Sequence, residues 1–188
     1  MIRFISLLLF FCFGIFAQAS QFYDLKPNKD YENDSITLNF LPFHANKNQV
    51  YVDSTGNKYW EYQYNNSQRE RYVYYKDKKL LANVPEKYGT LNNHLVLYHP
   101  DMDHVYDTYW PLDAKIGETW KAKILHFNVN ARLAEFGDMV FNNQKIKYAK
   151  IDFLDLKTGK EGYGLFGENI GLIEFKLGYR YVRLKNPN

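Results

Sequence analysis

The chain has 188 residues, and its 24 Lys and Arg against 21 Asp and Glu give a formal net charge of +3. Both signs are interspersed, so the composition does not indicate a nucleic-acid partner, which requires basic residues gathered on one face. The length is sufficient for one domain with its own hydrophobic core.

The first 19 residues form a predicted signal peptide. Arg3 supplies a positive charge, residues 4–16 are apolar, and Ala17-Gln18-Ala19 matches a cleavage site of the small-x-small type. The apolar run, at about 13 residues, is shorter than the roughly 20 that a membrane-spanning helix needs. We therefore expect an exported protein, periplasmic or extracellular, with no membrane span after cleavage.

Cleavage after Ala19 would remove Cys12, the only cysteine of the chain. The remaining segment, residues 20–188, could then use neither disulfides nor thiolate catalysis nor cysteine-bound metal. Small exported eukaryotic domains usually rely on disulfides, so their absence favours a bacterial envelope protein. We predict a single β-rich domain over residues 20–188.

Alternation of apolar and polar residues predicts strands along most of this domain. Aromatic residues make up 18% of the chain and suit a pleated, half-buried surface. A period of two is the pattern of strands with one buried side. In chain order the clearest segments are Ser35–Phe40, Tyr59–Tyr64, Arg71–Tyr75, His94–Tyr98, Met139–Phe141, Lys145–Leu154, Glu161–Phe166, Gly171–Phe175 and Tyr179–Leu184.

Short turn sequences separate these segments. Asp53–Asn57 and Asp155–Lys160 are Asp-to-Gly loops typical of hairpins, and Asn142–Gln144 is a third candidate. Residues 130–137 fit either a short helix, capped by Asn130 and stopped at Gly137, or another strand. Connections this short force antiparallel pairing. The predicted fold is an all-β antiparallel meander that forms a sandwich or a curved half-barrel, with little helix.

Two segments resemble known sequence elements. Trp110–Trp120, WPLDAKIGETW, resembles the PL-x-x-G-x-x-W element of uncharacterised exported bacterial β-rich proteins, and Phe166–Phe175 resembles their closing G-x-x-I-G-L-I element. The resemblance extends from Trp110 to Phe175. It implies a β-rich envelope protein and no particular activity.

A cluster of metal-ligand residues follows the His94–Tyr98 strand. His99, Asp101 and Asp103 share one side of an extended chain, and a turn at Pro100 could add His104. A catalytic metal site needs about three converging protein ligands and an open position for water. The simpler interpretation is a polar turn in which Asp side chains cap backbone amides.

The aromatic strands offer a second candidate site. Trp60, Tyr62 and Tyr64 share one face, and Tyr72 and Tyr74 lie on the expected partner strand, while Glu61 should point to solvent on the opposite face. Exposed aromatic rows bind sugars or apolar ligands, whereas buried ones fill a core. Both interpretations remain open from the sequence.

Other chemistries lack a complete set of residues. Residues 162–167 spell G-x-G-x-x-G, but a strand pattern follows where a dinucleotide site needs a helix, so no cofactor is predicted. No serine lies in a Gly-x-Ser-x-Gly motif. We therefore predict a non-catalytic protein that binds an envelope glycan, lipid or protein through its aromatic residues. The alternatives are a metal-dependent hydrolase that uses the His99 cluster and a purely structural assembly factor.

Overall fold

The computed structural model describes residues 23–41, 48–65, 68–75, 78–98 and 105–185, so the predicted signal peptide lies outside it. Within these ranges, no helix combines the length and apolarity required to cross a bilayer. The elements are β1 (Lys26–Pro27), η1 (Lys29–Tyr31), η2 (Leu38–Phe40), β2 (Asn48–Val52), β3 (Lys58–Asn65), β4 (Gln68–Tyr75), β5 (Lys78–Leu91), β6 (His94–Tyr98), β7 (Val105–Pro111), β8 (Thr119–Ile124), β9 (Phe127–Phe141), β10 (Gln144–Asp155), β11 (Glu161–Gly167), β12 (Gly171–Leu177) and β13 (Arg180–Leu184).

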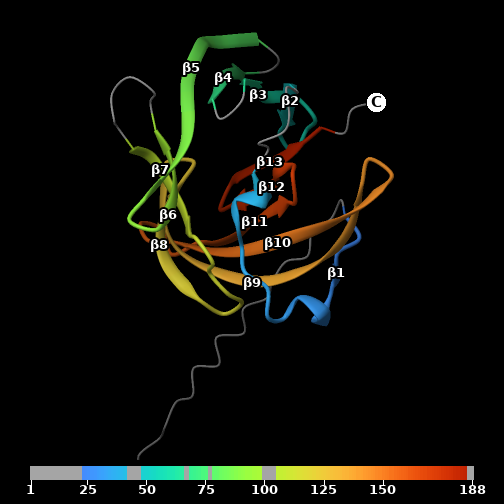
Figure 1. The fold of residues 1–188 in the computed structure, drawn as a ribbon. Helices are drawn as coiled ribbons and strands as arrows, with labels where there is room; N and C mark the ends of the chain where they lie inside the picture. Colours follow the sequence, from blue (N-terminus) through green and yellow to red (C-terminus); the bar gives the residue numbers. More distant parts are fainter. Residues whose placement is uncertain (1–22, 42–47, 66–67, 76–77, 99–104, 186–188) are drawn as a thin grey trace, which may run out of the picture.

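The strands form one antiparallel sheet that closes on itself (Figure 1). The order runs β9-β10-β11-β12-β13-β2-β3-β4-β5-β6-β7-β8, and β8 then pairs with β9 along its whole length, from Thr119 with Arg132 to Ile124 with Phe127. β1 pairs with β9 at Lys26–Asp138 and Pro27–Gly137, beyond the stretch of β9 that pairs with β8. The all-β, antiparallel prediction is confirmed. The prediction of a sandwich or a curved half-barrel is wrong. The β8–β9 pairing joins the two ends of the meander, so the sheet forms a closed barrel.

Two joints of the barrel are short. β13 and β2 meet through only two residue pairs, Arg183 with Val52 and Leu184 with Tyr51. β7 and β8 pair only at Thr108 with Lys123. These joints divide the barrel into an N-terminal arc, β2–β7, and a C-terminal arc, β8–β13.

The predicted hairpin turns are confirmed. Asn142 and Asn143 join β9 to β10 with φ angles of 51° and 60°, the left-handed pair that a two-residue type I′ turn requires. The Asp53 side chain accepts N–H bonds from Thr55 and Asn57 in the β2–β3 turn. Local polar side chains therefore define where these strands end.

Residues 130–137 and 35–40 show where local pattern and tertiary structure differ. The ambiguous segment 130–137 lies inside β9 and is a strand. Ser35–Phe40 was predicted as a strand, but it forms one isolated bridge at Ser35 and then η2, whose first turn is capped by Thr37. The alternating apolar side chains of this segment still anchor it, because Ile36 and Phe40 are 0% and 2% exposed.

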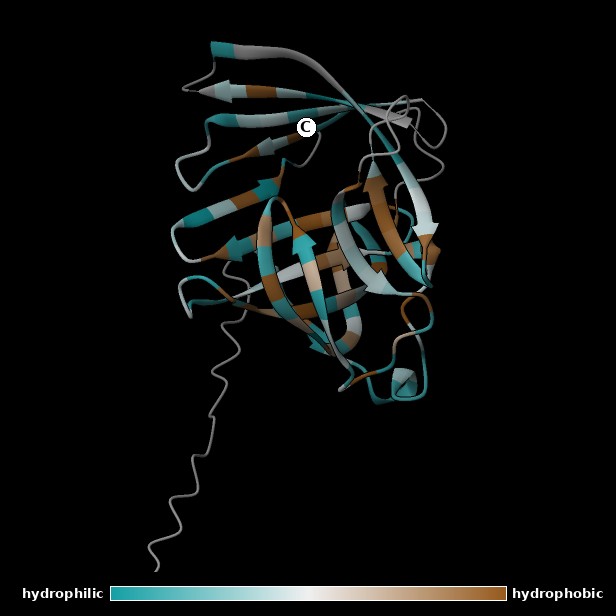
Figure 2. Cartoon of the chain, turned by 90° about the vertical axis from the view of Figure 1, so that its left-hand side faces the viewer, coloured by the Kyte–Doolittle hydropathy of each residue, from teal (hydrophilic) through white to brown (hydrophobic). Residues whose placement is uncertain are grey.

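The apolar core is densest in the C-terminal arc. Leu133, Ile151, Phe175 and Val182 point into the barrel and are fully buried. Burial of each such side chain contributes roughly 1.5–3 kcal/mol relative to exposure. In Figure 2, brown apolar segments recur along the strands of the barrel body.

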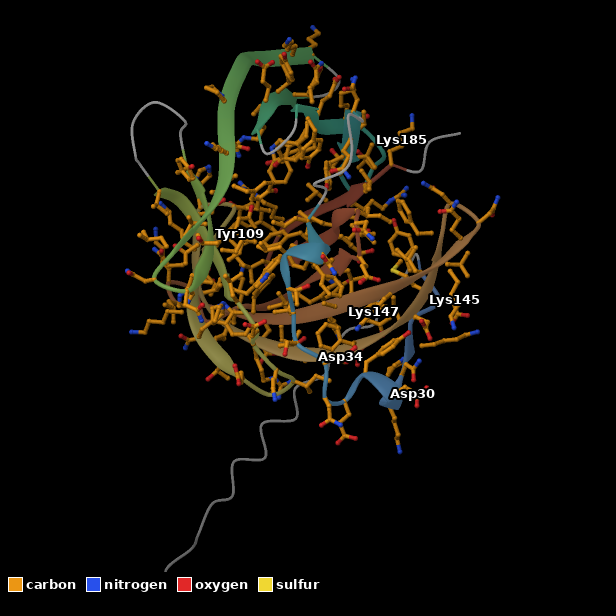
Figure 3. All side chains as sticks on the ribbon, viewed as in Figure 1. Asp30, Asp34, Tyr109, Lys145, Lys147 and Lys185 are labelled. Atoms are coloured by element: carbon orange, nitrogen blue, oxygen red, sulfur yellow. The ribbon has the colours of Figure 1, made fainter. Side chains whose placement is uncertain are left out.

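Residues 26–41, here called the N-terminal strap, bind across β9 and β10. Asp138 on β9 accepts hydrogen bonds from Asn28 and Tyr31, each 3.1 Å long. Lys147 on β10 forms an ion pair with Asp34 and lies 4.3 Å from the ring centroid of Tyr31 (Figure 3). Further along the strap, Phe40 packs against Phe136 inside the barrel, with ring centroids 5.6 Å apart. In the β9–β10 register Asp138 and Lys147 share a face with Phe136, so the strap is held along one face of the C-terminal arc.

Candidate functional site

The structure places the first three predicted aromatic residues inside the barrel. Trp60 and Tyr62 are 4% and 1% exposed, and Tyr64 is half-buried beside them. The ring of Tyr51 lies 5.4 Å from that of Tyr62 and 6.3 Å from that of Trp60, edge-on to both. Edge-to-face packing of this kind is typical of a filled core.

The polar tips of this aromatic row close the joint between the two arcs. The Tyr51 hydroxyl donates to the Leu172 carbonyl, and Gln49 Nε2 donates to the Ile170 carbonyl at 2.8 Å. Tyr64 in turn donates its hydroxyl to Gln49 Oε1 at 2.9 Å. The pairing of β12 with β13 begins at Glu174. The carbonyls of Ile170 and Leu172 precede this point, and the side chains of Gln49 and Tyr51 donate to them instead.

Tyr72 and Tyr74 lie on the opposite, outer face of the sheet. In the β3–β4 register Glu61 is directly opposite Tyr72, whereas Trp60 is opposite Val73. Paired residues share a face and neighbours along a strand alternate. The five predicted aromatic residues therefore do not form one surface.

Glu61 is at the centre of a hydrogen-bond network on this outer face. Its carboxylate accepts bonds from the Tyr74 hydroxyl at 2.8 Å, Lys58 Nζ at 3.0 Å and Gln63 Nε2 at 3.4 Å. Its side chain is only 15% exposed, so the expectation that Glu61 points freely into solvent is wrong. Burial favours the neutral acid, but the three bonds outweigh it and hold the pKa of Glu61 below its usual range.

The two outer tyrosines are held in fixed positions. The Tyr72 hydroxyl donates to Glu70 Oε2 at 2.7 Å, and this bond, with a smaller contribution from burial, raises the pKa of Tyr72. Burial first, and then the bond to Glu61, raise the pKa of Tyr74. Both phenols are consequently neutral hydrogen-bond donors across the physiological pH range.

Lysine side chains lie over the tyrosine rings of the same face. Lys58 Nζ is 4.5 Å from the Tyr74 ring centroid and Lys79 Nζ is 3.9 Å from that of Tyr72. Lys87 makes a longer contact, 6.0 Å, with Tyr98 on β6. Such cation–π contacts contribute about 0.5–1 kcal/mol at exposed sites. We call this surface the outer Tyr–Lys face; it comprises Lys58, Glu61, Gln63, Glu70, Tyr72, Tyr74, Lys79, Lys87 and Tyr98.

The inner face of the N-terminal arc carries buried charges. Arg71 Nε lies 3.2 Å from Glu86 Oε1, and the Glu86 side chain is 1% exposed. Asp107 is 2% exposed and accepts the backbone N–H groups of Leu125 and His126, each at 3.1 Å. Burial raises the pKa of Asp107, and the nearby charge of Glu86 raises it further, although the bonds from the turn oppose the shift.

Asp107 also explains an unusual turn. Leu125 and His126 join β8 to β9 with φ angles of 50° and 70°, where Asn or Gly is preferred. The carboxylate accepts both turn amides and so fixes a backbone that the two residues would not adopt readily alone. A structural role for Asp107 therefore accounts for its burial.

The predicted metal cluster cannot be placed. His99, Asp101, Asp103 and His104 all lie outside the described residues. Across the ranges that the structure describes, no group of three or more His, Cys, Asp or Glu side chains is arranged to hold a metal ion.

The glycine-rich segment 162–167 forms β11, and β12 follows it without a helix. A Cβ atom on Gly162 would lie 2.0 Å from the Lys176 carbonyl oxygen, so this glycine permits a close approach of two strands. Packing within the sheet thus accounts for a glycine of the G-x-G-x-x-G motif.

Sequence reasoning missed the polar members of the outer Tyr–Lys face. Glu61, Gln63 and Glu70 occupy alternate positions on β3 and β4, which is the signal of a shared face. Their link to Tyr72 and Tyr74 depends on the register between the two strands, which the sequence alone does not fix.

Comparisons of the chain with protein-family models, with curated proteins and with solved structures return no match.

Proposed function

We propose that the protein is an exported, non-catalytic binding protein and that it recognises a glycan on the outer Tyr–Lys face. The observation that carries this proposal is the paired arrangement of Tyr72 and Tyr74. Both rings are half-exposed, each hydroxyl is bound by a carboxylate, and each ring has a lysine above it.

The chemistry of this face matches that of a sugar ring. Tyrosine offers a flat apolar surface with a polar edge, which complements the C–H face and the hydroxyl groups of a pyranose. Gln63, Glu61 and Glu70 supply further hydrogen-bond groups beside the rings. Lys58, Lys79 and Lys87 outnumber the two glutamates of the face, which favours sugars that carry carboxylate or other acidic groups.

Preorganisation supports binding over a purely structural role. The network already fixes the rotamers of Tyr72 and Tyr74, so a ligand would not need to order them. Such rigid tyrosines provide contact area at low entropic cost in other recognition surfaces. The predicted signal peptide of residues 1–19 supports export. N-terminal sequencing of protein recovered from cells tests whether this peptide is removed, and an intact Met1 would contradict cleavage after Ala19.

An oligosaccharide array that contains neutral and acidic glycans, followed by titration of the hits, tests the binding site. The Tyr72→Ala/Tyr74→Ala variant should lose at least about tenfold in affinity, equivalent to about 1.4 kcal/mol. Val140→Ala is the control, because Val140 is 60% exposed on β9 and is not among the residues of this face.

A bound glycan whose affinity is equal in both variants would contradict the assignment of the face. Tyr72→Phe refines the test, because it keeps the ring and removes the bond to Glu70. A loss of affinity in Tyr72→Ala that Tyr72→Phe largely restores would assign the main contribution to ring contact.

A further inference from the structure

Three hairpin turns converge at one end of the barrel. They are the β8–β9 turn at His126, the β10–β11 turn from Asp155 to Lys160, and the β12–β13 turn at Gly178 and Tyr179. Together they surround a hollow of about 320 Å³. A second hollow of about 550 Å³ adjoins it along β8, and Asn128 and Lys157 line both.

The two hollows are lined by lysines. Lys157 lies between them, Lys160 lines the first, and Lys121 and Lys123 line the second. In the described part of the chain, none of these four lysines takes part in an ion pair. Four lysines thus line these two adjoining hollows, here together called the depression.

One carboxylate lines the depression, and it is already engaged by its own turn. Asp155 accepts the backbone N–H of Lys157 at 3.0 Å and the hydroxyl of Thr158. These bonds lower the pKa of Asp155, so it is ionised. Four lysines against one aspartate leave a formal charge of +3 around the two hollows.

The floor of the depression is apolar. Phe127 and Leu177 line the first hollow, and Ala122 and Leu156 line the second. Arg180 keeps its guanidinium 5.1 Å from the Phe127 ring centroid, which adds a positive charge beside the wall. The lining of the depression thus combines cationic and apolar side chains.

We propose that this end of the barrel binds a phosphate-bearing ligand through several of these lysines. Phosphate oxygens accept strong charge-assisted bonds from several lysines at once. Free ammonium groups that converge on a concave surface also raise the local concentration of anions. The site is separate from the outer Tyr–Lys face and shares none of its residues.

Titration calorimetry on the full domain tests the proposal with two arms. One arm uses tripolyphosphate, with sulfate as the reference anion. The other uses phosphatidylglycerol vesicles, with phosphatidylcholine vesicles as the reference. Lys157→Gln/Lys160→Gln and Lys121→Gln/Lys123→Gln should each weaken binding by at least about tenfold, because charged hydrogen bonds are lost.

Lys115→Gln is the matched control, since Lys115 is an exposed lysine that lines neither hollow. It should bind as the parent chain does, and so should Tyr72→Ala/Tyr74→Ala, which separates this site from the proposed glycan face. The arm that binds identifies whether the phosphate is free or in a lipid headgroup. The proposal would be overturned if the protein bound both probes no more tightly than their reference compounds. It would also be overturned if both double-lysine variants bound the probes as tightly as the parent chain. Circular dichroism confirms that the variants fold.

Discussion

The two arcs of the barrel have the same antiparallel backbone but are held together by different chemistry. In the C-terminal arc Ile151 and Phe175 are fully buried on the inner face, and its buried charged residues, Lys150 and Glu174, occupy the neighbouring, alternate positions of the same strands. In the N-terminal arc the inner face mixes tyrosines with the buried Arg71–Glu86 ion pair and Asp107. One fold therefore combines a conventional core with an interior that depends on polar partners.

This difference shows where stability and function are separated. Apolar burial needs no precise partner, so the C-terminal arc can serve as a scaffold. Buried charges contribute little net stability and are costly when a partner is lost. Both arcs bury charged groups, and in the N-terminal arc Glu86 and Asp107 are buried on the inner face of the sheet whose outer face carries the proposed binding residues.

The largest expected effect is a truncation in the C-terminal core. Phe175 contacts Phe153 and Phe127, with ring centroids 5.7 Å and 6.1 Å away. Phe175→Ala should lower the free energy of unfolding by about 4 kcal/mol, because it removes apolar contacts and leaves a cavity. Urea denaturation of Tyr72→Ala, a half-exposed aromatic of the N-terminal arc, should show a loss below about 1 kcal/mol. Equal losses in the two variants would remove the proposed distinction between the arcs.

A smaller effect is expected at the joint between the arcs. Tyr51→Phe removes the hydroxyl that donates to the Leu172 carbonyl and leaves that carbonyl without this donor. The loss should be about 1–2 kcal/mol in unfolding free energy. Faster amide hydrogen exchange in β2 and β13, with unchanged exchange in β9 and β10, would locate the effect at the joint. Exchange that rises evenly in all strands would show that the joint is not a separate unit.

The smallest effect distinguishes the arcs by the sign of their pH dependence. Asp107 has a raised folded pKa, so its contribution to stability grows as the pH falls from that value toward the unfolded value near 3.8. Asp155 has a lowered folded pKa, so its contribution is present above about 3.8 and is lost as the pH falls through the folded value. The stability difference between the parent chain and Asp107→Asn should therefore increase toward acid, and that for Asp155→Asn should decrease.

Thermal unfolding from pH 3 to pH 7 measures both differences. The same sign for the two variants would show that Asp107 is stabilised as a carboxylate, contrary to the effect of its burial.

Much of the fold could be predicted because strand and turn signals are local. The Tyr59–Tyr64 alternation lies in β3, and Asn142-Asn143 forms the predicted turn. Ser35–Phe40 has the same alternation but serves as part of the strap. Ile36 donates its N–H to the Ala114 carbonyl and accepts the N–H of Asp113, and both partners lie in a loop and not in a strand ladder. An alternation with a period of two predicts which side chains are buried. It does not predict whether the segment pairs with a neighbouring strand.

The sequence by itself determined the strand content and the hairpin turns. Only the tertiary structure decided that β8 pairs with β9 to close the barrel, and that Tyr72 lies opposite Glu61 rather than beside Trp60. It also decided that Lys121, Lys123, Lys157 and Lys160 meet at one end, although they come from two separate segments of the chain. The physical reason is that strand register and hairpin convergence are set by contacts between distant segments, and a shift of one residue reverses every face.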